Sequence, residues 1–206
     1  MESEITKATL VNQALIDLGQ PPNFSIDEET GLGGIVDIVW PGVADETFGL
    51  HDWTFCRKTF RLNRQAAQPE SGWKYAFNLP GKKVGDPLAI LIDPRRDVVL
   101  REFYLEGTEV HCDQEQIWAR CRVMVDPRYW DPAFRAAYRK ALAAELAVPL
   151  LQDVDLKDFL RKEAFGTPSE GGAGGKFGRL IAQNRAASPQ YAPLYENDPL
   201  TGARWG

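Results

Sequence analysis

The sequence predicts an α+β fold: a helical bundle made by the N- and C-terminal halves of the chain, an inserted antiparallel β-rich subdomain, and an extended C-terminal arm. Three observations favour it. Apolar residues recur at helical spacing on both sides of residues 53–126, they alternate with polar residues inside that range, and residues 188–206 are rich in proline and aromatic side chains. We therefore expect N-terminal helices in 1–52, the β-rich insertion in 53–126, C-terminal helices in 127–187, and the arm in 188–206.

The strongest helix signal lies in residues 129–149. Asp131 is placed to cap this helix and Pro132 to be its first residue, where the missing N–H of proline costs no hydrogen bond. We expect Pro149 to end the helix or to kink it. This segment is predicted to be the central core helix. Its apolar face consists of Phe134, Ala137, Tyr138, Ala141, Leu142 and Val148.

One acid, Glu145, falls in the middle of that apolar face. A buried carboxylate persists only when it is paired or hydrogen-bonded, so we expect an ion pair or a hydrogen bond to a tryptophan or an arginine. Arg120 and Arg122, in the preceding strand, are the candidate partners. Tryptophan and phenylalanine around the helix are expected to anchor the core. The predicted structural core residues are Trp53, Trp73, Trp130, Phe134 and Glu145.

Four further helices are expected around the central one. The first should be capped by Ser3 and stop at Gly19, and the second should kink near Trp40, which precedes the Pro41–Gly42 pair. The glycine-rich stretch 166–175 indicates a flexible break before the last helix. The predicted ranges are 3–18, 27–50, 153–164 and 176–187.

Residues 53–126 predict five or six strands. Polar and apolar residues alternate from Phe55 to Leu62, and short apolar runs separated by turn residues follow. Glu106-Gly107 is expected to form the turn of a hairpin. The predicted strands are 55–62, 73–79, 88–92, 100–105, 108–112 and 117–125, with a loop over 65–72.

The formal charge of −5 is unevenly distributed along the chain. No lysine or arginine lies between Lys7 and Arg57, and that interval holds eight acids, so the remainder of the chain carries +3. Either this region is a solvated acidic face, or copies of the chain meet acidic face to basic face around a ring. The acids are Asp17, Asp27, Glu28, Glu29, Asp37, Asp45, Glu46 and Asp52.

Few residues suggest catalysis or metal binding. His51 and His111 are the only histidines, neither has a cluster of cysteines or carboxylates at metal-ligand spacing near it, and any Ser–His–Asp set would have to use one of them. The glycines before Lys176 fail as a phosphate loop, because Phe177 stands where serine or threonine is needed. We therefore predict no catalytic, cofactor-binding or metal-binding residue and no membrane contact. Three reduced core cysteines are expected: Cys56, Cys112 and Cys121.

Two other functions stay open on the residues alone. Asp113, Glu115 and Glu145 could provide acid and base for a small hydrolase, if one pocket brings two of them together. Alternatively, the chain could be a monomeric interaction module. Residues 188–206 have too few apolar side chains to form a core of their own, but they could become ordered on a partner.

Four segments carry recognisable motifs: Asn-Gln-Ala-Leu-Ile-Asp-Leu-Gly at 12–19, Leu-His-Asp-Trp-Thr-Phe at 50–55, Ser-Gly-Trp-Lys-Tyr-Ala-Phe-Asn-Leu-Pro at 71–80, and 122–150, which contains Trp-Asp-Pro-Ala-Phe and Leu-Ala-Ala-Glu-Leu-Ala. In this order, over about residues 5–165, they resemble bacteriophage head-to-tail adaptor (connector) proteins of the tail tubular protein A family. The chain departs from the family pattern at Asp52, where the family has proline, and at 166–175, which interrupts the final helix.

The resemblance implies a structural virion protein, assembled in the host cytoplasm, and not an enzyme. Relatives form a twelve-fold ring between the portal and a downstream tail or nozzle protein. Double-stranded DNA passes through the bore without sequence-specific binding, and an acidic region suits this role because a basic bore would hold the phosphates. The arm of relatives climbs onto the portal, which here implies portal binding by Tyr191, Leu194, Tyr195 and Trp205.

Overall fold

A computed structural model describes residues 5–26, 31–170 and 174–187 of the 206-residue chain, and its helices and strands confirm the α+β class. The helices are α1 (Lys7–Asp17), α2 (Gly31–Gly49), α3 (Pro132–Leu151), α4 (Val154–Phe165) and α5 (Gly175–Ala187). The strands are β1 (Arg57–Arg61), β2 (Asn63–Arg64), β3 (Tyr75–Asn78), β4 (Lys83–Asp93), β5 (Val98–Val99), β6 (Tyr104–Glu106), β7 (Glu109–Cys112) and β8 (Trp118–Val123). Short 3-10 helices are η1 (Thr54–Cys56), η2 (Pro127–Tyr129) and η3 (Pro168–Glu170).

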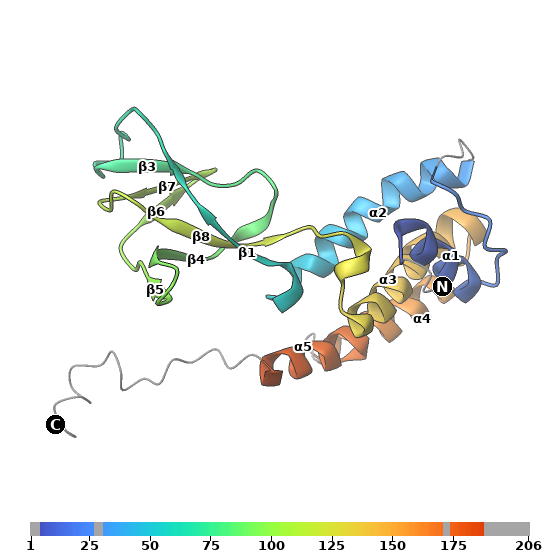
Figure 1. Ribbon diagram of the computed structural model, residues 1–206. Coiled ribbons are helices and arrows are strands. Elements are labelled where there is room, and N and C mark those ends of the chain that lie inside the picture. Colours follow the sequence, from blue (N-terminus) through green and yellow to red (C-terminus); the bar gives the residue numbers. More distant parts are fainter. Residues whose placement is uncertain (1–4, 27–30, 171–173, 188–206) are drawn as a thin grey trace, which may run out of the picture.

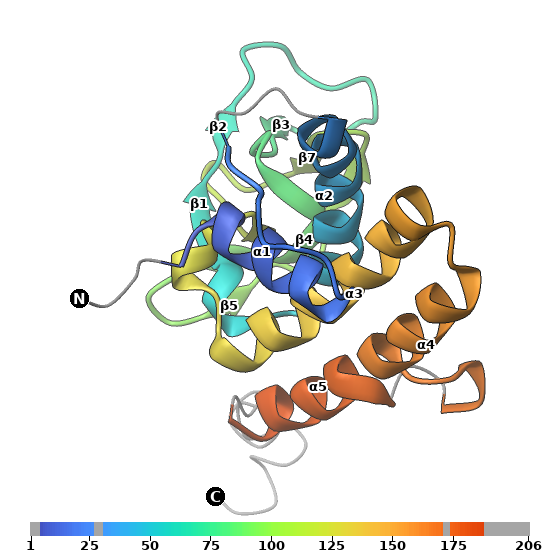
Figure 2. The same ribbon diagram turned by 90° about the vertical axis from the view of Figure 1, so that its right-hand side faces the viewer.

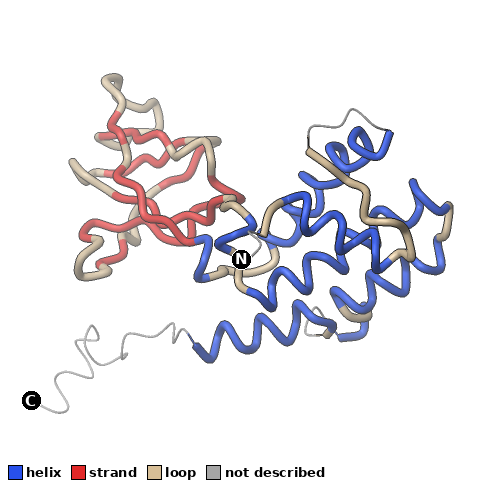
Figure 3. The backbone as a smooth tube through the Cα atoms, turned by 45° about the vertical axis from the view of Figure 1, so that its right-hand side comes forward, coloured by secondary structure: helices blue, strands red, loops and turns tan. Residues whose placement is uncertain are grey.

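The chain forms two lobes. The α-helices gather in a helical body, and the strands form a β-subdomain that projects from it (Figures 1 and 3). The two lobes are joined by the chain that follows α2 and by the chain that precedes α3. Figure 2 shows α3 between the N-terminal helices and the pair α4 and α5. Segments from both ends of the described chain therefore complete one helical body.

Helix α3 is the centre of the helical body and contacts each of the other four helices. Asp131 caps it, because its carboxylate accepts two backbone N–H groups of the first turn at 2.8 and 3.3 Å, as predicted. The helix does not end at Pro149 but continues to Leu151. A proline so near the end removes only one intrahelical hydrogen bond. Gln152 then ends the helix with a left-handed backbone, φ 57°.

Phe134 lies in the middle of the helical core and is fully buried. Its ring centroid lies 4.9 to 6.3 Å from the centroids of six other aromatic rings. Five of these six pairs have edge-to-face geometry, which is one of the arrangements that aromatic rings prefer. Burial raises the pKa of the Tyr138 phenol, whose hydroxyl donates to the Trp40 carbonyl at 3.3 Å. The six rings belong to Phe48, Trp53, Phe55, Trp130, Tyr138 and Phe177.

Among the predicted core aromatics, Trp53, Trp130 and Phe134 are buried, but Trp73 is not a core residue. Trp73 is half-buried and belongs to neither hydrophobic core. The reason is its position in the loop before β3, where the alternating pleat of a strand no longer directs side chains into the sheet interior.

The N-terminal helices differ from their predicted ranges at the ends. Ser3 lies outside the described residues, and α1 is instead capped by Thr6, which exchanges hydrogen bonds with Thr9 in a capping box. The predicted start of the second helix, at 27, also lies outside the described residues. Helix α2 runs through Pro41 as one helix. Within the described ranges, no helix combines the length and apolar character that a membrane crossing needs.

The β-subdomain contains two four-stranded antiparallel sheets, in the orders β1-β8-β4-β5 and β2-β3-β7-β6. Residues from both sheets enclose a second core around Phe77, Ile90 and Val110. The predicted hairpin is present, with Glu106 opposite Glu109. The described residues hold more strands than the five or six predicted, because β2 and β5 are two-residue edge strands, too short to leave an alternating pattern.

Candidate functional site

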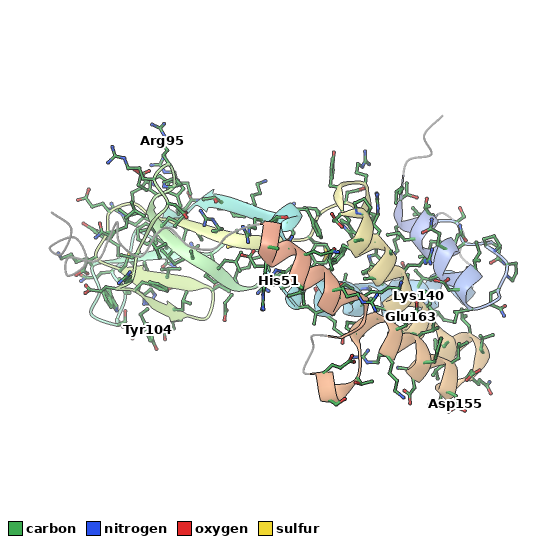
Figure 4. The ribbon with its side chains drawn as sticks, turned by 90° about the horizontal axis from the view of Figure 1, so that it is seen from below. His51, Arg95, Tyr104, Lys140, Asp155 and Glu163 are labelled. Atoms are coloured by element: carbon green, nitrogen blue, oxygen red, sulfur yellow. The ribbon has the colours of Figure 1, made fainter. Side chains whose placement is uncertain are left out.

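The predicted portal-binding residues lie outside the described residues, but the helix before them is fixed. Asn184 of α5 lies 3.2 Å from His51 Nε2, and its amide donates to the Thr54 hydroxyl at 3.3 Å. Figure 4 places His51 at the boundary between the helical body and the β-subdomain. Helix α5 is thus fastened, one turn before its end, to the junction of the two lobes. The residues outside the described range are Tyr191, Leu194, Tyr195 and Trp205.

Glu145 is paired, as predicted, but its partners come from α4. Its carboxylate accepts from the Lys157 ammonium at 2.7 Å and from the Arg161 guanidinium at 2.8 Å, and Arg161 also reaches Glu46 of α2 at 2.6 Å. The Glu145 side chain is 26 % exposed, so it lies at the edge of the core and not in its interior. The network links α3, α4 and α2, and Glu145 has a structural role.

The prediction that Arg120 or Arg122 contacts Glu145 is wrong. Both arginines lie on β8, which belongs to the other lobe. Arg120 forms an ion pair with Asp97, and Arg122 donates to the Gly49 carbonyl at the end of α2, at 2.9 Å. Strand β8 directly precedes α3 in the sequence, but the chain passes from the β-subdomain to the helical body between them. The arginines of β8 therefore do not reach Glu145.

Most of the described acids of the acid-rich N-terminal segment are neutralised within the chain. Four of its five described acids form ion pairs, and Asp17 bridges to two bases of α3, Arg139 and Lys140. Lys140 continues to Glu163, and Figure 4 shows these two side chains close together. These acids therefore hold the N-terminal helices to the rest of the chain. The pairs are Asp17–Arg139 (2.7 Å), Asp37–Lys7 (2.8 Å), Glu46–Arg161 (2.6 Å) and Asp52–Arg57 (2.7 Å).

The three carboxylates considered for a hydrolase do not meet. Glu145 is held by two bases in the helical body, whereas Asp113 and Glu115 follow β7 in the β-subdomain. Asp113 accepts the backbone N–H of Lys74 at 3.1 Å, which fixes a loop. Among the residues that the structure describes, no three histidine, cysteine or acidic side chains are grouped so that they could hold a metal.

The three cysteines are buried free thiols, as predicted. Burial raises the pKa of Cys56 to about 11 and also raises the pKa values of Cys112 and Cys121. Because the thiolate is the reactive form, these protonated thiols are poor nucleophiles.

A hydrogen-bonded chain of three polar side chains lies on the second sheet. His111 of β7 is almost fully buried; its Nδ1 lies 2.8 Å from the Ser71 hydroxyl and its Nε2 lies 3.0 Å from the Glu109 carboxylate. The hydrogen bond from His111 lowers the pKa of Glu109. Hydroxyl, imidazole and carboxylate stand in the order of a nucleophile, a base and an orienting acid. The same bonds pin the 65–74 loop, which carries Ser71, onto the sheet.

A hollow of about 410 Å³ opens beside this chain. Its lining combines two carboxylates, two aromatic rings and a hydroxyl: Glu70, Ser71, Trp73, Tyr104 and Glu106. The register of the β6–β7 hairpin explains the placement of two of these five residues, Tyr104 and Glu106. Tyr104 is directly opposite His111 and Glu106 is opposite Glu109, so these four side chains share one face of the sheet. The loop before β3 contributes the remainder.

The residue pattern did not predict this site, because Ser71 and His111 are forty residues apart in the sequence. The pairing of β3 with β7 brings them together, and a single sequence does not specify that pairing. One local signal was present: Glu109 and His111, two residues apart on a strand, must point to the same face. No family model matches the chain, and no curated protein matches it either.

Proposed function

We propose that this chain is a structural virion protein: a ring-forming head-to-tail adaptor that binds below the portal, connects the capsid to the tail and lets DNA pass through its bore. The observation that carries the proposal is the two-lobed architecture, in which both halves of the chain build one helical body and a β-subdomain projects from it (Figure 1). The resemblance of residues 5–165 to the tail tubular protein A family supports it.

Large apolar side chains exposed on the helical body add support. Ile38 is 81 % exposed, Tyr129 67 % and Phe159 64 %. Covering such side chains with a neighbouring chain removes apolar surface from water and stabilises an assembly, and tyrosine and phenylalanine are enriched at interfaces. Isolated exposed apolar residues also occur on ordinary monomers. The architecture therefore carries the argument, and these residues support it.

In this proposal the chain acts through contacts and not through catalysis. Copies form a closed ring of twelve, residues 188–206 bind the portal, and a downstream tail or nozzle protein binds the opposite side. Aromatic residues spaced along a proline-rich segment suit such binding, because proline lowers the entropy lost on ordering and aromatic side chains anchor interfaces. The double-stranded DNA is guided and its sequence is not read.

Deletion of residues 188–206 tests the portal contact. The deletion retains Asn184 and the rest of α5, so we expect unchanged circular dichroism and an unchanged thermal melt. The truncated protein should no longer complete tailless heads. Replacing only Tyr191, Tyr195 and Trp205 with alanine should give the same loss, whereas the matched control, with Gln190, Asn197 and Thr201 replaced by alanine, should retain activity. Normal completion of heads by the truncated protein would overturn this assignment.

The hydrogen-bonded Ser71, His111 and Glu109 support a second candidate function, a serine-type hydrolase. In such an enzyme the Ser71 oxygen attacks a carbonyl carbon, His111 takes the hydroxyl proton, and Glu109 orients the imidazole. A fluorophosphonate probe would then label the wild-type protein and not the S71A variant. The adaptor proposal predicts equal, background labelling of both.

A further inference from the structure

The hollow on the β-subdomain has the lining of a binding site for a cationic side chain. The Glu70 carboxylate has no partner among the described residues, and the nearest base to Glu106 is His111 Nδ1, at 3.8 Å. None of the described residues that line the hollow is a lysine or an arginine. Trp73 and Tyr104 add two aromatic rings, whose faces attract a guanidinium or ammonium group. Arginine fits best, because its planar head stacks on rings and binds carboxylates at the same time.

The walls of this hollow are held in place before any ligand arrives. Ser71, in the lining, is fastened to buried His111, and the backbone of Lys74 is fastened to Asp113. On the other side, Tyr104 and Glu106 are fixed by the paired strands β6 and β7. A preformed site loses little conformational entropy on binding.

An arginine pair is presented by the turn between β4 and β5. Arg95 and Arg96 are exposed, and neither guanidinium has a partner among the described residues. The acids of the turn are already used: the Asp93 carboxylate accepts the Arg95 backbone N–H at 2.9 Å, and Asp97, which has a left-handed backbone, pairs with Arg120. The turn therefore has a fixed shape and projects two positive charges that no described acid neutralises. We call this turn the projection.

The projection and the hollow lie on opposite sides of the β-subdomain. The turn leads into β5, the outermost strand of one sheet, and Tyr104 begins β6, the outermost strand of the other. Figure 4 shows Arg95 and Tyr104 at opposite edges of this lobe. Two different, complementary patches on opposite sides of one subunit are what a head-to-tail contact requires, and such contacts generate a closed ring when the rotation between neighbouring copies closes.

We propose that Arg95 and Arg96 of one copy enter the hollow of the next copy, with the guanidinium groups against Trp73 and Tyr104 and paired with Glu70 and Glu106. This inference rests on the proposed ring and names a contact that closes it. The occupant is a second copy of this chain, because the same lobe supplies both halves of a charge-complementary pair. The acids of residues 1–52 are less suited to joining copies, since four of those described are paired internally.

Charge reversal tests the contact with the full chain. The R95E/R96E variant has an acidic turn and an acidic hollow, and the E70K/E106K variant has a basic turn and a basic hollow. Each variant alone places like charges together, so its ring assembly, followed by sedimentation, should require a protein concentration about ten-fold higher or more. An equimolar mixture should assemble as alternating rings, because every contact in it then joins opposite charges. The matched control reversals, K82E/K162E and E102K/E115K, change exposed residues outside both patches.

Each outcome of the charge-reversal experiment either supports or overturns the proposed contact. Loss with either variant, rescue in the mixture and normal assembly of both controls support the contact, and rescue also shows that the variants are folded. Normal assembly of R95E/R96E or of E70K/E106K overturns this contact and leaves the proposed ring intact. Failure of the mixture to assemble also overturns it. If the wild-type protein forms no ring, with or without a portal, both the contact and the proposed function fall.

Discussion

Replacing Phe134 with alanine should lower the free energy of unfolding of the helical body by about 4 kcal/mol. Truncation of a buried phenylalanine costs roughly 3–5 kcal/mol, through lost transfer free energy and the cavity that remains. Phe134 has no exposed surface, and its six ring partners come from α2, the chain between α2 and η1, η1, the chain before α3, α3 itself and α5. Because these partners come from separate segments, we expect them to close only part of the cavity. The cost should therefore fall in the upper part of that range.

The assay is urea unfolding followed by far-ultraviolet circular dichroism, with the midpoint and slope compared between variants. Phe159→Ala provides the control, since this phenylalanine of α4 is 64 % exposed and should change stability by less than about 0.5 kcal/mol. A Phe134→Ala protein within about 1 kcal/mol of wild type would refute the view that this ring organises the helical core.

Three further predictions concern stability. Glu145→Ala should cost about 1–2 kcal/mol in urea unfolding, less than a buried pair, because Glu145 and its partners are partly exposed; a loss above about 4 kcal/mol would contradict this exposure argument. Burial lowers the pKa of His51 below its ordinary value near 6.5. As the pH drops below about 6.5, the unfolded chain therefore binds a proton that the folded chain does not, and the folded state should lose stability. In thermal melts over this pH range, H51Q should lose less stability than the wild type. Gly107 has φ 57°, so Gly107→Ala should cost about 1 kcal/mol, whereas Gly81→Ala, with open space and no such φ, should be nearly neutral in the same unfolding assay; equal effects would argue against backbone strain at the turn.

Local chemistry made much of the fold predictable. The Asp131 cap and the hairpin turn at Gly107 each depend on a few adjacent residues, and both occur as expected. Helix α4 begins within one residue of its predicted start. Helical and strand periodicities likewise separated the β-subdomain from the helices on both sides of it. These features are encoded over short distances, where one sequence suffices.

The errors arose where distant segments meet. Glu145 was assigned to arginines that precede it in sequence, but α4 folds back onto α3 and supplies Lys157 and Arg161. The contact of Ser71 with His111 depends on which strands pair, and so does the hollow beside it. A residue outside a strand, such as Trp73, has no periodic neighbour to indicate the side it faces. The candidate site is built almost entirely from such relations, so the sequence alone did not predict it.

The mass of the purified full-length chain, measured alone and with a portal ring, tests the central proposal most directly. We predict a closed ring of about twelve times the 23.1 kDa protomer mass, formed alone or on the portal, and a stable complex with the portal. A protein that remains at 23.1 kDa in both measurements, with no portal complex, would contradict the adaptor proposal.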